Sequence, residues 1–277
     1  MKPQRKIVPQ WFVCIENGDM EGLVRLLEFK ELSDLNASVN TDKWDKGLTV
    51  LGRAALMGNV AMVEMLLRRG ADVDKICATH SERKFYSTGN KFTPLGAAIS
   101  ICNADMVQVM LNEGASVKRV CFNDAWTPLE YALGKMSSRL NGTIKQFAEE
   151  VQAEQRQKAE RDDAALLRIV ELLLSGGAVY DEESRLGRHT PLGVAVMRVQ
   201  IPTIRVLLRK GARLEKTCLV NTAGSHEYSP LGLAVALGFD DVAEVLRAAG
   251  AQDAPFKFGG KMVRPSELPA LLKRQVA

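Results

Sequence analysis

The chain has 277 residues, of which 46% are hydrophobic and 25% charged, and its formal net charge is +4. This hydrophobic share is enough for a continuous core, and the weak positive charge does not by itself indicate nucleic acid. No run approaches eighteen uninterrupted apolar residues, so we expect no membrane span. The five cysteines are far apart and form no Cys-x-x-Cys pair, which favours reduced thiols in the cytoplasm or nucleus.

The first predicted element is a pair of helices over residues 9–30. Pro9 begins the first helix, Gly18 turns the chain, and the apolar residues on either side of the turn are spaced to form one face of each helix. We interpret this pair as an N-terminal cap for the elements that follow.

Four later segments share one internal spacing. Each begins with Thr or Ser before a Leu and reaches a Gly-Ala pair after 21 residues, and between these points the apolar residues recur at helical intervals. The Thr or Ser is a good helix N-cap and the Gly a good helix end, so each segment predicts two short helices. The four segments run from Thr49 to Gly70, from Thr93 to Gly114, from Thr190 to Gly211 and from Ser229 to Gly250.

A fifth copy of the motif is stretched. It runs from Thr127 to Gly177, which is 50 residues and predicts an insertion at about 137–165. From Thr143 to Leu174 there is no Pro, and Glu, Gln, Lys, Arg and Ala predominate, so we expect a long helix. Its base would pack on the repeats and its middle, as far as Asp163, would lie in solvent. Whether this arm has a function is open.

The pattern resembles the ankyrin repeat, whose signature is Thr-Pro-Leu-His-x-Ala followed by Val-x-x-Leu-Leu-x-x-Gly-Ala. The best matches are Val63, Leu66, Leu67, Gly70 and Ala71 and their counterparts at 206–212. The resemblance implies an all-α ankyrin-repeat solenoid of about six helix-turn-helix units. The expected domain covers 1–254, with units at about 9–45, 46–90, 91–124, 125–187, 188–226 and 227–254.

The signature His is missing throughout. Gly52, Gly96, Gly193 and Gly232 occupy its position, and Glu130 does so in the stretched copy. The hydrogen bonds that this His makes in the family must therefore be absent, and we expect weaker individual repeats.

Three segments depart from the regular repeat. The connections at His80–Lys91 and Cys218–Tyr228 are enlarged and combine β-favouring residues with turn residues, so we expect extended hairpins. Residues 255–277 form a C-terminal extension in which Ser266 would cap a short helix. That helix is either a cap on the last repeat or, through Leu268–Leu272, a recruitment motif.

The sequence offers no combination of residues for catalysis. Its three histidines, His80, His189 and His226, all lie in connections, and there is no phosphate-binding loop or zinc-protease motif. Cysteines and histidines of the connections fall along one edge, where zinc is conceivable, but they come from four separate connections. We therefore predict a protein without enzymatic activity, cofactor or metal.

The resemblance implies a protein-binding module or adaptor, monomeric on its own, whose partner contacts the hairpins and the first helices. The alternative is nucleic-acid or acidic-ligand binding through the basic hairpin edge, but acidic residues in the same connections make nucleic acid the weaker hypothesis. Arg and aromatic residues most often dominate binding energy. The predicted partner-binding residues are Arg83, Lys84, Phe85 and Tyr86 in the first enlarged connection and Arg53, Met57, Lys135 and Arg198 on the first helices.

Overall fold

The structure is a computed structural model that divides the chain into two compact units, Met1–Tyr131 and Ala132–Ala277, which are described separately. The division falls within one helix, α7 (Pro128–Lys135). The residues that the structure describes are 10–28, 35–36, 39–40, 46–79, 90–123, 125–137, 149–181, 189–216, 218–222, 224–258 and 261–271.

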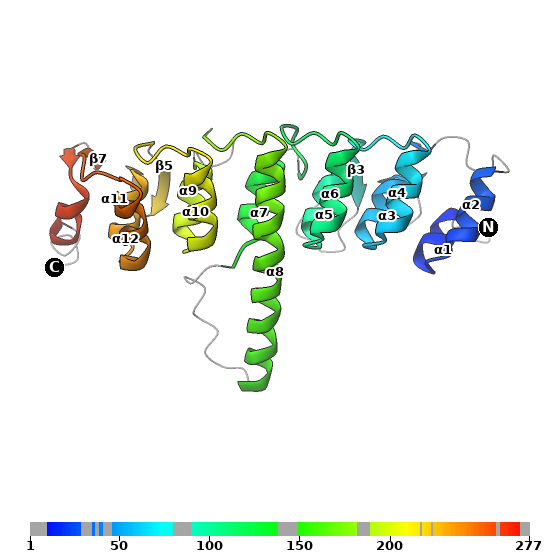
Figure 1. Ribbon diagram of the computed structural model, residues 1–277, viewed down its shortest axis with the longest axis horizontal. Helices are drawn as coiled ribbons and strands as arrows, with labels where there is room; N and C mark the ends of the chain where they lie inside the picture. Colours follow the sequence, from blue (N-terminus) through cyan, green and yellow to red (C-terminus); the bar gives the residue numbers. More distant parts are fainter. Residues whose placement is uncertain are drawn as a thin grey trace, which may run out of the picture. The chain divides into compact units, whose positions relative to one another are not determined.

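The first unit contains consecutive pairs of antiparallel helices (Figure 1). In each pair the first helix packs on the second, and the first helices of neighbouring pairs also pack on one another. This arrangement buries the helix faces that the apolar spacing predicts. The pairs are α1 (Gln10–Glu16) with α2 (Met20–Glu28), α3 (Val50–Leu56) with α4 (Val60–Arg68), and α5 (Pro94–Ser100) with α6 (Ala104–Asn112).

The predicted caps determine where these helices begin. The Thr49 hydroxyl accepts a hydrogen bond from the Gly52 amide at 3.0 Å, and Thr93 accepts one from Gly96 at 3.2 Å. α4 and α6 begin in the same way, because an Asn side chain accepts from the amide three residues on, as at Asn59. These bonds satisfy backbone donors that have no partner within the helix.

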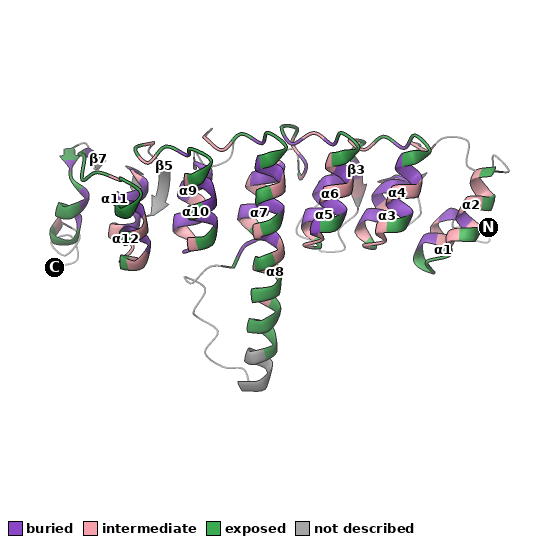
Figure 2. Cartoon of the chain, in the orientation of Figure 1, coloured by how far each residue is buried: buried purple, intermediate pink, exposed green. Residues whose placement is uncertain are grey.

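The helices end at glycines where the sequence predicts it. Gly70 and Gly114 have φ values of 90° and 86°, in the left-handed region that glycine adopts at low cost. Between cap and glycine, the side chains that face neighbouring helices are buried (Figure 2). In the pairs α3–α4 and α5–α6, the largest fully buried side chains are Leu51, Met62, Leu66, Leu95, Ile99, Met106 and Met110.

The second unit continues the pattern of helix pairs. α9 packs on α10 and on α11, and α11 packs on α12, so first helices again lie beside first helices. The fold is therefore the predicted all-α repeat. Its helices are α8 (Glu149–Ser175), α9 (Pro191–Met197), α10 (Ile201–Arg209), α11 (Pro230–Ala236), α12 (Asp240–Ala248) and the short 3-10 helix η2 (Pro265–Glu267).

The predicted long helix is confirmed. α8 is a single helix that contains the insertion from Glu149 onward and the second helix of the stretched copy, whereas residues 138–148 lie outside the described part of the chain. Its C-terminal part packs on α10 and buries Leu166, Ile169, Val170 and Leu173, whereas its N-terminal part projects beyond the neighbouring helices with exposed polar side chains (Figures 1 and 2).

Asp163 differs from the expectation of a solvated residue. The Ser137 amide donates to its Oδ1 at 2.9 Å, the Gln200 side-chain amide donates to its Oδ2 at 3.0 Å, and the Ser137 hydroxyl also donates to Oδ2. The carboxylate therefore joins three segments of the second unit. The solvated part of the arm ends before Asp163.

Short antiparallel hairpins occupy the connections. In the first enlarged connection the strands pair Cys77 with Phe92, and the intervening residues 80–89 lie outside the described part of the chain. In the second enlarged connection the pairing covers 218–228, which confirms the predicted hairpin. The strands are β1 (Val39–Asn40), β2 (Lys46–Leu48), β3 (Cys77–Thr79), β4 (Asn90–Phe92), β5 (Cys218–Thr222), β6 (Gly224–Tyr228), β7 (Phe256–Phe258) and β8 (Lys261–Val263).

The C-terminal extension repeats the start of another unit. β7 and β8 form a hairpin, and η2 then packs on α11 as α11 packs on α9. Ser266 does not occupy the predicted capping position, because Arg264 is the N-cap and Pro265 begins the helix. The Ser266 amide instead donates to Asp253 Oδ1 at 2.8 Å.

Successive loops are joined by hydrogen bonds that recur from repeat to repeat, which we call the loop ladder. In the first unit the Asp72 amide donates to Asn36 Oδ1 at 2.8 Å and the Ser116 amide to Asp74 Oδ1 at 3.1 Å. In the second unit the Arg213 amide donates to Asp181 Oδ1 at 3.1 Å. Each bond links a loop to the equivalent loop of the next repeat.

The Asp181 bond predicts a pH-dependent contribution to stability. Burial alone would raise the pKa of Asp181, but hydrogen bonds from the backbone and side chain of Arg213, with the charges of Arg213 and Lys216, outweigh burial and lower the pKa. Because the pKa of Asp181 is lower in the folded state than its unfolded value of about 3.9, the ionised carboxylate stabilises the fold at pH values above about 3.9. This stabilisation is lost as the pH falls through the folded-state pKa. Asp181→Asn should therefore lower the urea midpoint more at pH 7 than in acid below the folded-state pKa. An equal loss at both pH values would contradict this assignment.

Candidate protein-binding surface

The eight predicted binding residues have different surroundings. Arg83, Lys84, Phe85 and Tyr86 lie outside the described residues. The other four, Arg53, Met57, Lys135 and Arg198, lie on first helices or at their C-terminal ends, two in each unit.

Arg53 is engaged within the first unit. Its guanidinium pairs with the Glu16 carboxylate, with Nε 2.6 Å from Oε1, and it lies over the Phe12 ring with 4.7 Å between Cζ and the ring centroid. Only 20% of the Arg53 side chain is exposed. The residue therefore fixes α3 against α1, and its polar atoms already have a partner.

Met57 is exposed at the C-terminal end of α3, with 44% of its surface accessible. Ile101 occupies the same position at the end of α5, since each follows its capping Thr by eight residues, and it is 38% exposed. A methyl group placed on Gly58, the residue after Met57, would lie 3.4 Å from Ile101 Cδ1. Met57 and Ile101 thus form an exposed apolar pair.

Ile101 was not among the predicted binding residues. The repeat spacing could have identified it, because the position that exposes Met57 in one repeat exposes Ile101 in the next.

Lys135 and Arg198 differ in exposure within the second unit. Lys135 is exposed at the end of α7. Arg198 is half-buried, and its Nη1 donates to the Met136 carbonyl oxygen, while burial lowers the pKa of its guanidinium. Arg198 therefore connects the end of α9 to the residue that follows α7.

The glycines that replace the signature His allow the connections to approach the first helices closely. A methyl group on Gly96 would lie 2.2 Å from the Cys121 carbonyl oxygen, and one on Gly52 would lie 2.4 Å from Cys77 Sγ. The Thr49 hydroxyl and Cys77 Sγ are 3.1 Å apart, within hydrogen-bonding distance. The space of the absent His is thus filled by the following connection.

The same packing occurs at the C-terminal end of the second unit. A methyl group on Gly232 would lie 2.7 Å from the Phe256 ring, which also contacts Tyr228 at 5.8 Å between ring centroids. The sequence contains a sign of the packing at Gly52 and Gly96, because Cys77 and Cys121 each follow their Gly by 25 residues, an interval that recurs from Gly193 to Cys218.

The two cysteines that pack against Gly52 and Gly96 are unsuited to act as nucleophiles. Cys77 and Cys121 are buried with free thiols, and burial raises the pKa of both, so the thiols stay protonated at neutral pH. Burial lowers the pKa of His189. In the described part of the chain, no three His, Cys, Asp or Glu side chains are grouped to hold a metal ion.

Aromatic residues of the connections also pack internally. The Phe122 and Tyr131 rings stack at 4.4 Å between centroids with 9° between their planes, and the Phe122 backbone pairs with Trp126.

Among the described residues, no helix is both long and apolar enough to cross a membrane.

The comparisons with known proteins agree with this architecture. The family model for the ankyrin repeat matches residues 46–78. The human ASB11 ankyrin repeat domain superposes with a TM-score of 0.57 at 22% identity and covers 95% of this chain and 96% of its own. The ankyrin repeat domain of Bcl-3, a member of the IkappaB protein family, gives a TM-score of 0.64 at 16% identity and covers 97% and 99%.

A comparison with curated protein sequences finds no significant match. At these identities the solved structures show the fold, and the family model independently recognises one repeat, which includes α3, α4 and the first two residues of β3. The Thr-capped helix pairs, the hairpin connections and both kinds of match agree. The chain therefore has the ankyrin-repeat fold, and its residues 46–78 match the ankyrin repeat itself.

Proposed function

We propose that the chain is a non-catalytic module that binds a partner protein through its first helices and hairpin connections. The observation that supports this most directly is the exposed apolar pair, Met57 and Ile101. Large apolar side chains exposed at neighbouring positions are typical of interaction sites. Two repeats present them at the same position, so a partner could contact both at once.

The remaining predicted residues would take part in binding within their own units. Arg83, Lys84, Phe85 and Tyr86 belong to the connection between α4 and α5, and their residue types suit an interface centre. Lys135 would add an exposed charge in the second unit. Arg53 and Arg198 already bind Glu16 and the Met136 carbonyl, so their role would be to hold the first helices in position.

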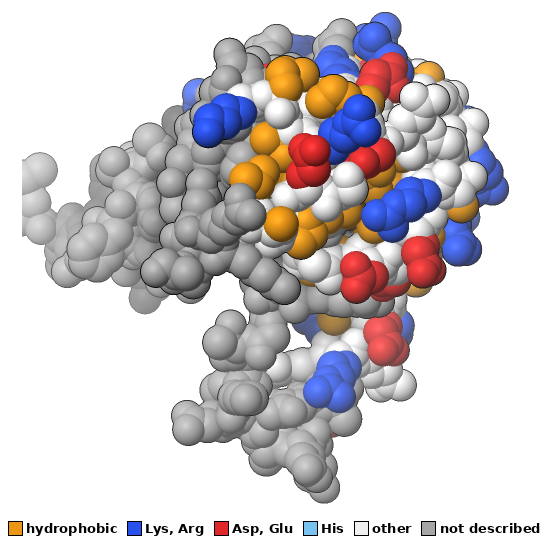
Figure 3. All heavy atoms as spheres, turned by 90° about the vertical axis from the view of Figure 1, so that its left-hand side faces the viewer, with side chains coloured by type: hydrophobic (Ala, Val, Ile, Leu, Met, Phe, Trp, Pro, Cys, Tyr) orange, Lys and Arg blue, Asp and Glu red, His pale blue; other side chains and the backbone are white. Residues whose placement is uncertain are grey.

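A protein partner suits the charge distribution better than nucleic acid does. The C-terminal face of the second unit intersperses Lys and Arg with Asp and Glu around hydrophobic side chains (Figure 3). Phosphate binding needs a field of one sign, whereas a protein interface uses mixed charge. Raising the salt concentration should therefore weaken binding only modestly.

The test compares capture by three forms of the chain. We expect Met57→Glu with Ile101→Glu to weaken partner binding at least tenfold, roughly 1.4 kcal/mol, because it places two charges in a desolvated contact. Partners are captured from native lysate, identified and purified, and their Kd for each form is measured by calorimetry. Thermal unfolding checks that the variants remain folded.

The control changes exposed apolar residues elsewhere. Val179 and Met262 are 41% and 66% exposed, and Val179→Glu with Met262→Glu should leave the Kd unchanged. Equal weakening by both pairs, or by neither, would contradict the proposed surface. Replacing Arg83 and Tyr86 by Ala should also weaken binding at least tenfold if the hairpin takes part, roughly 1.4 kcal/mol.

A further inference from the structure

The loop ladder is interrupted between the last two loops of the second unit. Asp74 and Asp181 each follow the glycine that ends a helix by four residues, and each accepts the amide of the next loop. Glu215 occupies this position after Gly211. The amide that it would accept is that of Gln252, but Glu215 makes no hydrogen bond with any described residue. Glu215 carries one methylene group more than the Asp that accepts the amide at the two equivalent positions.

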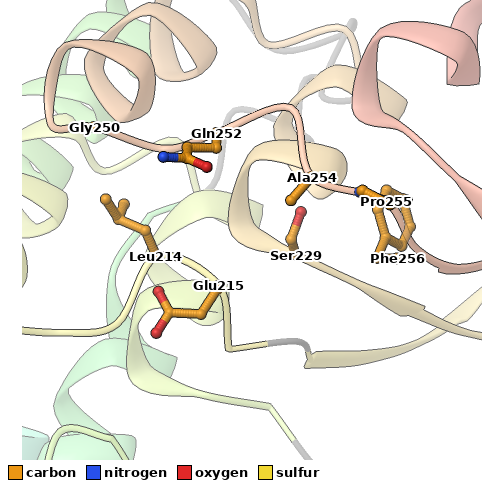
Figure 4. Close-up of a pocket in the computed structure, with 8 residues that line it drawn as sticks. All are labelled: Leu214, Glu215, Ser229, Gly250, Gln252, Ala254, Pro255 and Phe256. Atoms are coloured by element: carbon orange, nitrogen blue, oxygen red, sulfur yellow. The ribbon is translucent and has the colours of Figure 1, made fainter.

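A pocket of about 440 Å³ opens at this interruption, and we call it the terminal pocket. Leu214 and Glu215 come from one loop, and Gln252 and Ala254 come from the facing loop (Figure 4). The Phe256 ring forms part of the lining and is itself buried. The pocket thus combines one carboxylate and one carboxamide with an apolar wall.

The basic residues next to Glu215 are bound elsewhere. Arg213 Nε lies 2.6 Å from Asp181 Oδ2, and Lys216 Nζ donates to the Asp181 carbonyl oxygen. Their positive groups therefore point to the preceding loop. Glu215 interacts with Arg213 through charge alone and makes no hydrogen bond with a described residue, so both of its oxygens can accept hydrogen bonds from a ligand.

We propose that the terminal pocket binds an arginine side chain of a partner protein, an inference that rests on the proposed protein-binding function. A planar guanidinium can donate two parallel hydrogen bonds to the Glu215 carboxylate and another to the Gln252 carboxamide oxygen. The methylene groups of the arginine would pack against Leu214 and Phe256. A lysine matches less well because its ammonium cannot make the paired contact.

The test titrates the full chain with acetyl-Gly-Arg-Gly-amide and follows the amide signals of Gln252 and Glu215 by NMR. The peptide should shift both signals saturably at millimolar concentration. The same peptide with lysine should bind at least threefold more weakly, and the citrulline peptide, which is neutral and isosteric, should not bind. Failure of the arginine peptide to shift these signals, or equal binding of the citrulline peptide, would overturn the proposal.

Two substitutions separate charge from geometry. Glu215→Gln removes the charge at nearly constant size and should weaken arginine binding at least fivefold. Glu215→Asp keeps the charge but should accept the Gln252 amide as Asp181 accepts that of Arg213, which closes the pocket and abolishes binding while stability rises. Unchanged binding by either variant would overturn the inference. The titration needs no partner, so its failure is distinguishable from failure of the Met57 and Ile101 experiment.

Discussion

Gly96→Ala should destabilise the chain by at least about 2 kcal/mol, although alanine is the better helix former by about 1 kcal/mol. The added methyl group would lie 2.2 Å from the Cys121 carbonyl oxygen, far inside van der Waals contact. That oxygen also accepts the Thr93 amide at 3.0 Å, so it cannot move without loss of a hydrogen bond. Urea unfolding measures the change as a lower midpoint.

Gly52→Ala is the matched comparison, because its methyl group meets the Cys77 side chain instead of backbone. Cys77→Ala should relieve part of this clash, so the double variant should be more stable than the sum of the two single changes predicts. Cys121→Ala should give no such relief to Gly96→Ala. Relief of both clashes, or a Gly96→Ala variant as stable as wild type, would show that the connection does not press on the helix.

The local signals in the sequence were sufficient to predict the helices. A helix cap and a helix end depend only on residues close in sequence. The structure has the cap at Thr93, before Pro94, and the helix end at Gly114, after the apolar stripe. The continuous helix through the insertion followed from composition in the same way, since it contains no residue that breaks a helix.

Contacts between distant residues were not predictable in this way. From the replacement of the signature His by Gly, the sequence predicted only the loss of a hydrogen bond. In the structure, the absence of a side chain at Gly96 lets the Cys121 backbone pack closely against the helix. Arginine is a residue type that often binds partners, but the Arg53 guanidinium pairs with Glu16 and lies over the Phe12 ring. Such outcomes depend on which side chains the stacking of repeats brings together.

Two further intervals in the sequence indicate some of these contacts between repeats. The Gly-to-Cys interval of 25 residues recurs in three repeats, and the Asp74 position recurs as Asp181 and Glu215. The contacts between one repeat and the next at Cys77, Cys121, Asp74 and Asp181 follow these intervals, since equivalent residues tend to have equivalent neighbours. The terminal pocket was not predictable in this way, because its lining comes from two loops and the Phe256 ring, which only the folded chain brings together.

The C-terminal extension should contribute to stability as the repeats do. Leu268 is completely buried, and η2, which immediately precedes it, packs on α11. Leu268→Ala should therefore destabilise the chain by about 2–5 kcal/mol, since it removes buried methyl groups and leaves a cavity. We propose on this basis that the segment caps the last repeat, and that Leu268 is not available to recruit another protein.

Met262 provides the control for this substitution. It lies in the same extension but is 66% exposed, so Met262→Ala should change the free energy of unfolding by less than about 0.5 kcal/mol. Hydrogen exchange locates the effect, because loss of the cap should speed exchange in α11 and α12 before it reaches α9. A Leu268→Ala variant with unchanged stability and unchanged exchange in α11 would favour the recruitment motif, because a recruiting leucine must be accessible in the free chain.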